Sequence, residues 1–208
     1  MNRRLMMAQQ NKGFELVYTP SIGVFPEETG DWEWYGGRWN GAAGNGKKEL
    51  YKDYLYIPCK HDYQGCCFYI TNHPTAKNLE LSVGYRNFIH NTTSAADKGW
   101  LGLRLFSDFG AIEFRLVEDT VFEAHGINKH KKDIELTFPL TFKGVIQNGV
   151  ASAYINDELI YQTNELKACE NMEISASGAI WSVYDKRATA IGVKCEQFEI
   201  NSMKYKEW

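Results

Sequence analysis

Short runs in which apolar and polar residues alternate recur along most of this chain, and they constrain the fold more than any other feature. The clearest run covers residues 134–142, where every second position is apolar. A period of two is typical of a β-strand with one buried face, because successive side chains point to opposite sides. Similar runs cover residues 79–85, 101–105 and 112–116. No helical apolar stripe extends beyond about two turns, so we predict an all-β protein.

Turn-forming residues separate these runs and predict how the strands connect. Residues 150–155 and 158–162 flank Asn156-Asp157, a dipeptide that favours a tight hairpin turn. Pro139 lacks a backbone donor, so we expect the strand that contains it to lie at an edge or to carry a bulge. Many short strands separated by turns are typical of a sandwich or a barrel. We predict a two-sheet antiparallel β-sandwich.

Length and composition fit one folded domain. The chain has 208 residues, 44% of them hydrophobic and 14% aromatic, which is enough to form a core. With no repeat and no linker in view, we predict one sandwich domain over residues 13–208, preceded by an N-terminal arm over residues 1–12. The formal net charge is −3 at pH 7. No broad basic field is available to hold a phosphate backbone, so we expect no nucleic-acid partner.

The sequence also bears on location and redox state. No apolar run approaches the ~18 residues of a membrane span, so we expect no membrane insertion. Residues 5–8 form the only apolar stretch near the N-terminus, too short for a signal-peptide core. We expect the cytoplasm, or a virion or phage particle, unless a leader has been removed. Five cysteines, an odd number, indicate reduced thiols. The oligomeric state is left open.

Three segments share a distinctive pattern of strands and turns: residues 79–86 followed by 99–105, the hairpin at 149–161, and the closing strand at 191–200. Together they resemble the concanavalin A-like lectin/glucanase family, which includes laminin G-like domains. The resemblance covers residues 14–205 and implies a jelly roll of two packed antiparallel sheets, one of them often concave. It also implies glycan binding or, in some members, glycan hydrolysis or elimination, and fold alone does not choose among these roles. Residues 1–10 also resemble the start of prophage-encoded tail proteins.

Residues 31–41 are the most unusual stretch, because they combine three tryptophans with a tyrosine, two acidic residues, an arginine and an asparagine. A sugar ring has an apolar face and an edge of hydroxyls, so a glycan site needs an aromatic platform surrounded by polar groups. We predict that this stretch binds the ligand together with two further tryptophans. The predicted ligand-binding residues are Trp32, Trp34, Tyr35, Arg38, Trp39, Asn40, Trp100 and Trp181. In the alternative, the tryptophans fill one end of the sandwich core.

Other motifs match cofactor sites only in part. Residues 41–47 match the first seven positions of a phosphate-binding loop, but Lys48 stands where Ser or Thr should hold magnesium. Four residues of the types that bind zinc occur close together in the sequence. Two of them are consecutive, and consecutive residues of a strand point to opposite faces, so both cannot easily bind one ion. These candidate ligands are Cys59, His61, Cys66 and Cys67. No Asp-rich calcium loop is present, although members of the family often carry calcium. We predict no cofactor and no metal site, with calcium left as an alternative.

Hydrolysis of a glycan needs two carboxylates with separate roles. Glucanases of the family carry Glu-x-Asp-x-x-Glu on one strand, and its alginate lyases combine an Arg-rich strand with a Gln-x-His strand. This sequence has neither pattern. Carboxylates from separate strands could still pair, and the candidates are Glu33, Glu80 and Glu113. For Glu113 and Arg115, which share one face of a strand, we expect an ordinary surface ion pair.

The sequence therefore predicts a non-catalytic, lectin-like module that binds a glycan or polysaccharide, in a phage tail or as an accessory glycan-binding protein. Two alternatives stay open. One is a diverged glycoside hydrolase or polysaccharide lyase on the same fold. The other is a structural or assembly module that uses exposed aromatic residues for protein contacts.

Overall fold

The computed structural model of the chain describes most of the predicted sandwich domain. The described residues are 13–36, 38–39, 42–43, 48–58, 65–70, 76–89, 99–118, 120–168, 189–194 and 197–208. The predicted N-terminal arm, with its resemblance to prophage tail proteins, lies outside them and stays a prediction. The helices among the described residues are the 3-10 turns η1 (Pro20–Ile22) and η2 (Pro26–Thr29), and neither could cross a membrane.

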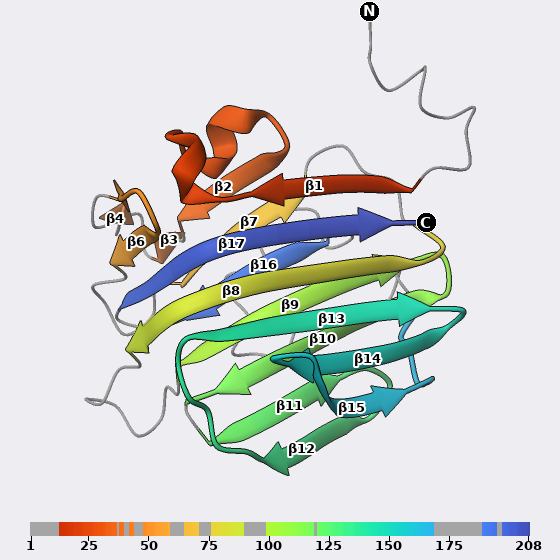
Figure 1. Cartoon of the computed structure of the whole chain (residues 1–208). Helices are drawn as coiled ribbons and strands as arrows, with labels where there is room; N and C mark the ends of the chain where they lie inside the picture. The colour runs from red at the N-terminus through yellow and green to blue at the C-terminus, as the bar shows by residue number, and fades with distance from the viewer. Residues whose placement is uncertain are drawn as a thin grey trace, which may run out of the picture.

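Sheet A forms one layer of the molecule, drawn in front in Figure 1. It has eight strands in the order β15-β14-β13-β8-β17-β6-β5, and β1 also pairs with β17. Its strands are β1 (Phe14–Tyr18), β5 (Glu49–Leu50), β6 (Leu55–Pro58), β8 (Leu79–Ile89), β13 (Leu140–Gln147), β14 (Val150–Ile155), β15 (Glu158–Thr163) and β17 (Gln197–Glu207).

Sheet B forms the second layer, behind sheet A in the same view. It has seven strands in the order β12-β11-β10-β9-β16-β7-β2. Its strands are β2 (Trp32–Gly36), β7 (Gly65–Ile70), β9 (Trp100–Ser107), β10 (Gly110–Val117), β11 (Val121–His125), β12 (Lys129–Asp133) and β16 (Ala190–Lys194). The short strands β3 (Arg38–Trp39) and β4 (Ala42–Ala43) form a separate two-stranded sheet. Neighbouring strands in both layers are antiparallel, which confirms the predicted two-sheet sandwich.

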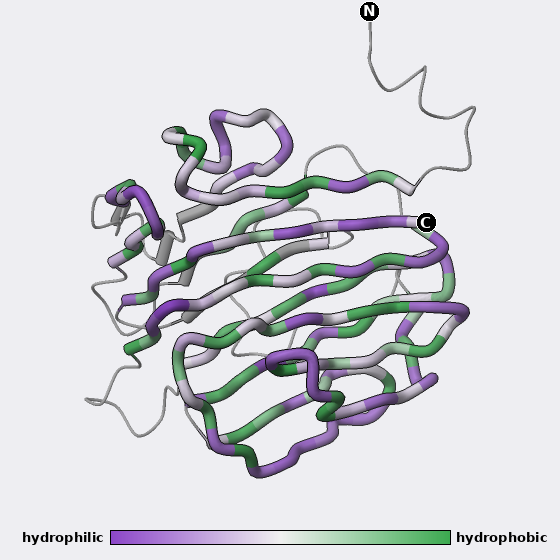
Figure 2. Tube along the Cα trace, viewed as in Figure 1, coloured by the Kyte–Doolittle hydropathy of each residue, from purple (hydrophilic) through white to green (hydrophobic). Residues whose placement is uncertain are grey.

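The core lies between the two sheets. Apolar residues at alternate positions of β8 in sheet A and β9 in sheet B are buried there, among them Leu81 and Leu103. Aromatic rings also link the layers, because Tyr161 of β15 packs with its ring centroid 5.5 Å from that of Phe122 on β11. Figure 2 shows the alternation of apolar and polar residues along the strands. β8, β9 and β10 contain the alternating runs at residues 79–85, 101–105 and 112–116, which confirms these three predicted strands.

The predicted hairpins are present. β14 and β15 pair across Asn156 and Asp157, whose φ angles are 49° and 65°. β13 and β14 pair across Asn148 and Gly149, with φ angles of 51° and 79°. Positive φ at both central residues is the requirement of a two-residue hairpin turn whose twist matches the strands. These turns explain why Asn, Asp and Gly stand at these positions.

The run at residues 134–142 is not one strand, so this prediction is wrong in its first half. Residues 134–139 lie outside any strand, and the Phe138–Pro139 peptide bond is cis. The segment crosses from β12 in sheet B to β13 in sheet A, and Ile134 and Leu136 pack half-buried against the core. Their alternation reflects a segment that covers the side of the sandwich. β13 lies between β14 and β8 and pairs with both without a shift of register, so the expectation of an edge strand or a bulge is also wrong.

β12 ends sheet B, and all five of its residues are exposed. Four of them are basic: Lys129, His130, Lys131 and Lys132. Figure 2 shows the strand as hydrophilic along its length. Charged side chains on an edge strand prevent further strands from pairing with it.

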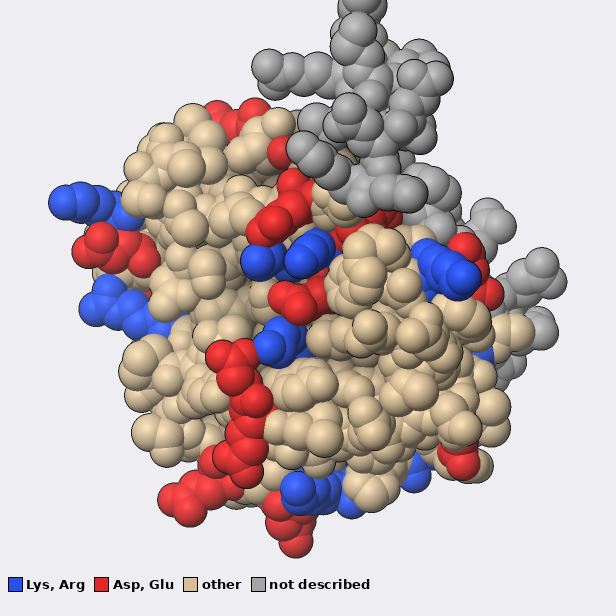
Figure 3. All heavy atoms as spheres, turned by 45° about the vertical axis from the view of Figure 1, so that its right-hand side comes forward, with Lys and Arg blue, Asp and Glu red and all other residues tan. Residues whose placement is uncertain are grey.

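Charges of both signs are mixed on the face drawn in Figure 3, where Lys and Arg residues lie next to Asp and Glu residues near its middle. An ion pair on sheet A joins Lys204 Nζ to Glu15 Oε1 at 2.8 Å. The prediction that nucleic acid is not a partner rests on the net charge and stays a prediction.

The close packing of the sheets at Gly144 of β13 can be tested by substitution. A Cβ atom there would lie 2.8 Å from a side-chain carbon of Leu105 and 3.2 Å from one of Phe114. Gly144→Val should lower the free energy of unfolding by ~1–3 kcal/mol, because overpacking a core forces strain on its neighbours. Urea denaturation measures this loss. Thr141→Val on the exposed face of the same strand is the control, expected within ~0.5 kcal/mol of the parent. A Gly144→Val protein as stable as the parent would contradict the close approach.

Candidate functional site

Sheet B turns a second set of side chains away from the core. On β9 the residues that alternate with the core leucines include Trp100 and Arg104, and on β10 they include Glu113 and Arg115. All four are buried, and Arg104 is 0% exposed. We call this surface the outer face of sheet B. Because water is excluded from it, its charges interact more strongly than they would at a solvated surface.

The strand register brings four ionisable residues together on this face. Glu113 of β10 is paired with His125 of β11, and Arg115 is paired with Glu123. Residues two apart on one strand share a face, so the four side chains occupy the corners of a square. Acidic and basic groups alternate around that square. Arg104 adjoins it, because β9 pairs Arg104 with Glu113 from the other side.

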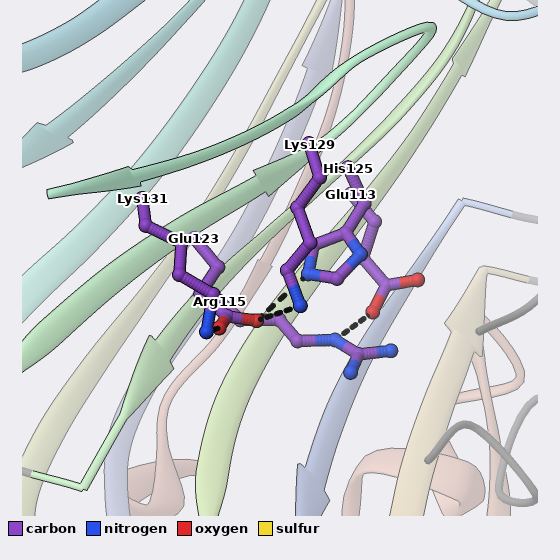
Figure 4. A network of polar contacts seen from close by, with 6 residues as sticks. All are labelled: Glu113, Arg115, Glu123, His125, Lys129 and Lys131. Carbon is purple, nitrogen blue, oxygen red and sulfur yellow. Dashed lines mark hydrogen bonds and ion pairs between the residues drawn. The ribbon is translucent and has the colours of Figure 1, made fainter. Parts of the chain in front are cut away.

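Direct contacts hold this ionic square in place (Figure 4). Arg115 Nε donates a hydrogen bond to Glu113 Oε1, and the Arg115 guanidinium carbon lies 4.4 Å from the ring centroid of Trp100. Glu123 binds three groups at once. Its Oε2 lies 2.9 Å from His125 Nε2 and 3.2 Å from Lys129 Nζ, and its Oε1 lies 2.7 Å from Lys131 Nζ.

These contacts fix the protonation states. Burial raises the pKa of Glu123, but hydrogen bonds from Lys131, His125 and Lys129 outweigh it, and the pKa falls to about 2. Burial, followed by the charge of Arg115, lowers the pKa of His125. At neutral pH Glu123 is therefore ionised and His125 neutral. An ionised carboxylate only accepts hydrogen bonds, so His125 Nε2–H donates to it.

The predicted ion pair between Glu113 and Arg115 is present, but it is not the surface pair that we expected. Both side chains are 3% exposed. The reason is the position of β10 in the middle of sheet B, where β9 and β11 flank it. A buried pair is costly to break, because removal of one partner leaves the other charge uncompensated.

The predicted carboxylate candidates do not form a pair. Glu80 alternates with core residues of β8, so it points away from sheet B. Glu33 of β2 lies on the outer face of sheet B, but β7, β16 and β9 separate β2 from β10. Four strand spacings of about 4.8 Å put it roughly 19 Å from Glu113, beyond the ~5–9.5 Å that glycoside hydrolysis requires. The sequence analysis missed Glu123 and His125. Their signal was a Glu-x-His pattern on the strand that follows Glu113-x-Arg115.

The tryptophan-rich stretch is structural where its side chains are described, and this corrects the predicted platform. Trp32 lies in the core at 2% exposure. Trp34 points to the same side, and its ring centroid lies 4.7 Å from that of Phe68. Lys48 Nζ covers the Trp34 ring at 4.4 Å. Core filling, the alternative, therefore describes both tryptophans. Asn40 and Trp181, with the side chains of Tyr35, Arg38 and Trp39, lie outside the described residues.

Lys48, the last residue of the phosphate-loop-like segment, is also engaged. It forms an ion pair with Glu27 and lies 4.9 Å from the ring centroid of Phe25. The ammonium group is thus held between two rings and a carboxylate. Lys48 stands where a phosphate-binding loop has the Ser or Thr that holds magnesium, and here its ammonium group is engaged by the protein's own side chains. The glycines at positions 41 and 44–46 lie outside the described residues.

Cys67 is buried on the outer face of sheet B, and burial raises its pKa to about 12. A thiol with that pKa is neither a good nucleophile nor a ready metal ligand. Cys59, His61 and the Cys66 side chain lie outside the described residues. Within the part of the chain that the structure describes, no group of three His, Cys, Asp or Glu residues is placed to hold a metal ion.

Solved structures share the architecture of these sheets. The endo-β-1,3(4)-glucanase SCLam of family GH16 superposes with a TM-score of 0.60 at 8% identity, covering 95% of this chain and 92% of its own. A legume lectin-like domain from Entamoeba histolytica gives 0.55 at 11% identity, with 93% and 97% covered. The chain has the concanavalin A-like jelly-roll fold.

The carbohydrate recognition domain of Emp46p in its metal-free form also shares this concanavalin A-like fold. It gives a TM-score of 0.51 at 12% identity, covering 86% of this chain and 89% of that domain. Comparison with family models and with curated proteins gives no match. At these identities the likeness establishes the fold, and the chemistry must come from the residues.

Lys48 is held by Phe25, Trp34 and Glu27, an arrangement that we call the Lys48 clamp. We predict that substitution of Lys48 lowers the stability of the protein. Lys48→Met keeps most of the side-chain stem but removes the charge between Phe25, Trp34 and Glu27. We expect the free energy of unfolding to fall by ~1–2 kcal/mol, the size of a partly desolvated cation–π contact. Urea denaturation measures the change. Lys52→Met at an exposed position is the matched control and should leave stability unchanged. Equal effects at both positions would contradict the clamp.

The lowered pKa of Glu123 predicts that the stability of the fold depends on pH. Its pKa of about 2 lies below the ordinary value of 4.5, so its ionisation stabilises the fold above about pH 4.5 and this contribution is lost as the pH falls towards 2. Glu123→Gln should remove ~2–3 kcal/mol of the stability that the parent loses in this range. Denaturation at several pH values measures it, with exposed Glu158→Gln as the control. Parallel pH profiles for Glu123→Gln and the parent would contradict the assignment.

Proposed function

We propose that this protein binds carbohydrate without cleaving it, at the outer face of sheet B. The observation that carries the proposal is the ionic square of Glu113, Arg115, Glu123 and His125 beside Trp100. At the exposed end of this face, the Glu123 carboxylate, the His125 imidazole and the ammonium groups of Lys129 and Lys131 offer the acceptors and donors that sugar hydroxyls need. The fold supports the proposal, because lectin-like domains share it.

The end of this face at β11 and β12 is its open side. Arg104, Glu113 and Arg115 are buried, whereas the side chains of Lys129 and Lys131 are 49% and 61% exposed. The His125 side chain is intermediate between these buried and exposed groups, because it is partly exposed. A glycan would approach from this end and meet His125 first.

The protonation states favour binding over cleavage. A glycoside hydrolase needs one carboxylic acid that keeps its proton until it protonates the leaving oxygen. Glu123, with a pKa of about 2, is ionised at neutral pH. Arg115 pairs directly with Glu113, whose carboxylate accepts a hydrogen bond from Arg115 Nε. Glu123 is therefore not prepared for the acid role.

The direct test is a glycan array with the purified protein, with and without calcium, and a reducing-end assay in the same wells. We expect binding without the release of new reducing ends. Calcium dependence would reveal a metal requirement that the sequence did not predict. Silence in both assays would contradict glycan binding and favour the structural or assembly alternative.

A variant pair locates the site. His125→Ala should weaken binding at least tenfold, because it removes a donor from the open end and leaves Glu123 with both lysines. His130→Ala is the matched control, because it changes a histidine on the neighbouring strand whose side chain stacks on Tyr161, on the other side of the sheet. Binding constants from isothermal titration calorimetry give the comparison. Equal binding by His125→Ala and the parent would place the site elsewhere.

One observation favours the hydrolase alternative. Glu113 and Glu123 are diagonal neighbours on adjacent strands, a separation of about 7–8 Å between backbones that fits a carboxylate pair. Reducing-end release that is lost in both Glu113→Gln and Glu123→Gln would establish this alternative. Release that survives in either variant would count against it.

A further inference from the structure

An exposed stack of side chains lies on sheet A, at the end where β5 and β6 meet. The rings of Tyr51 and Tyr54 are stacked, with centroids 4.5 Å apart and planes 11° apart. The guanidinium carbon of Arg86 on β8 lies 4.3 Å from the Tyr54 centroid. Both neighbours therefore pack against the Tyr54 ring. Tyr51, at the outer end of this tyrosine stack, is 42% exposed.

Hydrogen bonds hold the tyrosine stack in one arrangement. Tyr51 N–H donates to the carbonyl oxygen of Tyr54 at 2.9 Å, which closes the turn between β5 and β6. The Tyr51 hydroxyl donates to Glu49 Oε2 at 2.5 Å, and this bond raises the pKa of Tyr51 to about 12. Arg86 Nε lies 3.5 Å from Glu199 Oε2. A ligand would therefore meet rings that are already positioned, which lowers the entropic cost of binding.

Polar groups surround the stack on the same face of the sheet. Leu55 and Ile57 of β6 point into the core, so Tyr56 points outward, and the register pairs it with Glu49 on one side and Glu199 on the other. The Tyr56 hydroxyl donates to the side-chain oxygen of Gln197 at 3.2 Å. The surface thus combines an exposed ring with a rim of carboxylates, hydroxyls and an amide.

This chemistry selects the class of ligand. Carboxylate oxygens accept more than one hydrogen bond, so Glu49 and Glu199, beyond their contacts with Tyr51 and Arg86, favour a partner that supplies donors. Sugar hydroxyls supply them, whereas a proline-rich peptide, which could also stack on tyrosine, lacks backbone N–H groups. Two carboxylates against the single charge of Arg86 also disfavour phosphate, sulfate and uronate groups.

We propose that the Tyr51–Tyr54–Arg86 stack binds a neutral sugar ring, as a second glycan site on sheet A. The inference rests on the proposed carbohydrate binding for its ligand class. Its location is independent, because the stack and the ionic square lie on the outward faces of different sheets. One sugar ring cannot occupy both. Two sites on opposite faces would let the protein hold two glycan segments at once.

The test titrates the full chain, labelled with carbon-13 in its tyrosine rings, with neutral cello-, laminari- and manno-oligosaccharides. Signals of Tyr51 and Tyr54, assigned through Tyr51→Phe and Tyr54→Phe, should shift on binding. Tyr51→Ala should weaken binding at this site at least tenfold, and Tyr51→Phe, which keeps the ring, should retain most of it. Tyr154→Ala on β14 is the matched control, because Lys143 Nζ lies 4.8 Å from its ring centroid. Thermal unfolding confirms that each variant is folded.

Each outcome decides between the two proposals. The second site is supported if the Tyr51 and Tyr54 signals shift and if binding is weakened in Tyr51→Ala but not in Tyr51→Phe or Tyr154→Ala. If sugars bind but these signals stay still, and Tyr51→Ala binds like the parent, the second site is overturned while glycan binding at sheet B stands. If acidic oligogalacturonides or a proline oligomer shift the signals and neutral sugars do not, the ligand class is wrong. If no glycan binds anywhere, both proposals fail.

Discussion

β9 and β10 are buried on both of their faces, and much of the molecule is arranged around that constraint. The side towards sheet A carries leucine, isoleucine and phenylalanine, and burial of their apolar surface drives the association of the two layers. The opposite side carries Arg104, Glu113 and Arg115. Buried charges are costly unless they are paired. The neighbouring strand β11 supplies a residue of opposite charge, Glu123, which the strand register places opposite Arg115.

The same constraint supports the proposed binding role over hydrolysis. A carboxylic acid keeps a raised pKa when its surroundings are apolar or when another carboxylate is its nearest charge. Burial raises the pKa of Glu123, but hydrogen bonds from Lys131, His125 and Lys129 lower it to about 2. The contacts that make the buried charge of Glu123 tolerable also make this residue a poor proton donor. Hydrogen-bonding power towards a ligand is retained.

Many of the strands could be predicted from the sequence, because alternation and turn dipeptides report local geometry. The closing strand predicted at residues 191–200 is wrong, because the structure has two strands there, β16 in sheet B and β17 in sheet A. Leu101 to Leu105 and the Asn156-Asp157 turn behave as their neighbours in the sequence indicate. The ionic square could not be predicted in the same way, because it depends on which residues of β10 and β11 stand opposite each other. A shift of register by one residue would turn His125 towards the core. Glu113 and Arg115 were found because they share a strand, and Glu123 was missed because it does not.

Some sequence patterns have two possible physical causes, and these patterns do not determine the structure. The run at residues 134–139 alternates because one side of the segment covers the core, and a strand produces the same pattern by pairing. Trp32 and Trp34 are large aromatic residues in a polar stretch, which suits a sugar platform as well as a core. Only the position of β2 beside β7 decides between the two.

The basic border strand β12 has a consequence for the behaviour of many copies in solution. If two molecules met edge to edge at this strand, their Lys129, Lys131 and Lys132 ammonium groups would be brought close to one another. Mutual repulsion would oppose the growth of sheet B into a continuous sheet shared between molecules, and this repulsion weakens as ionic strength rises. The five residues of β12, at one edge of sheet B, therefore contribute to the colloidal stability of the protein.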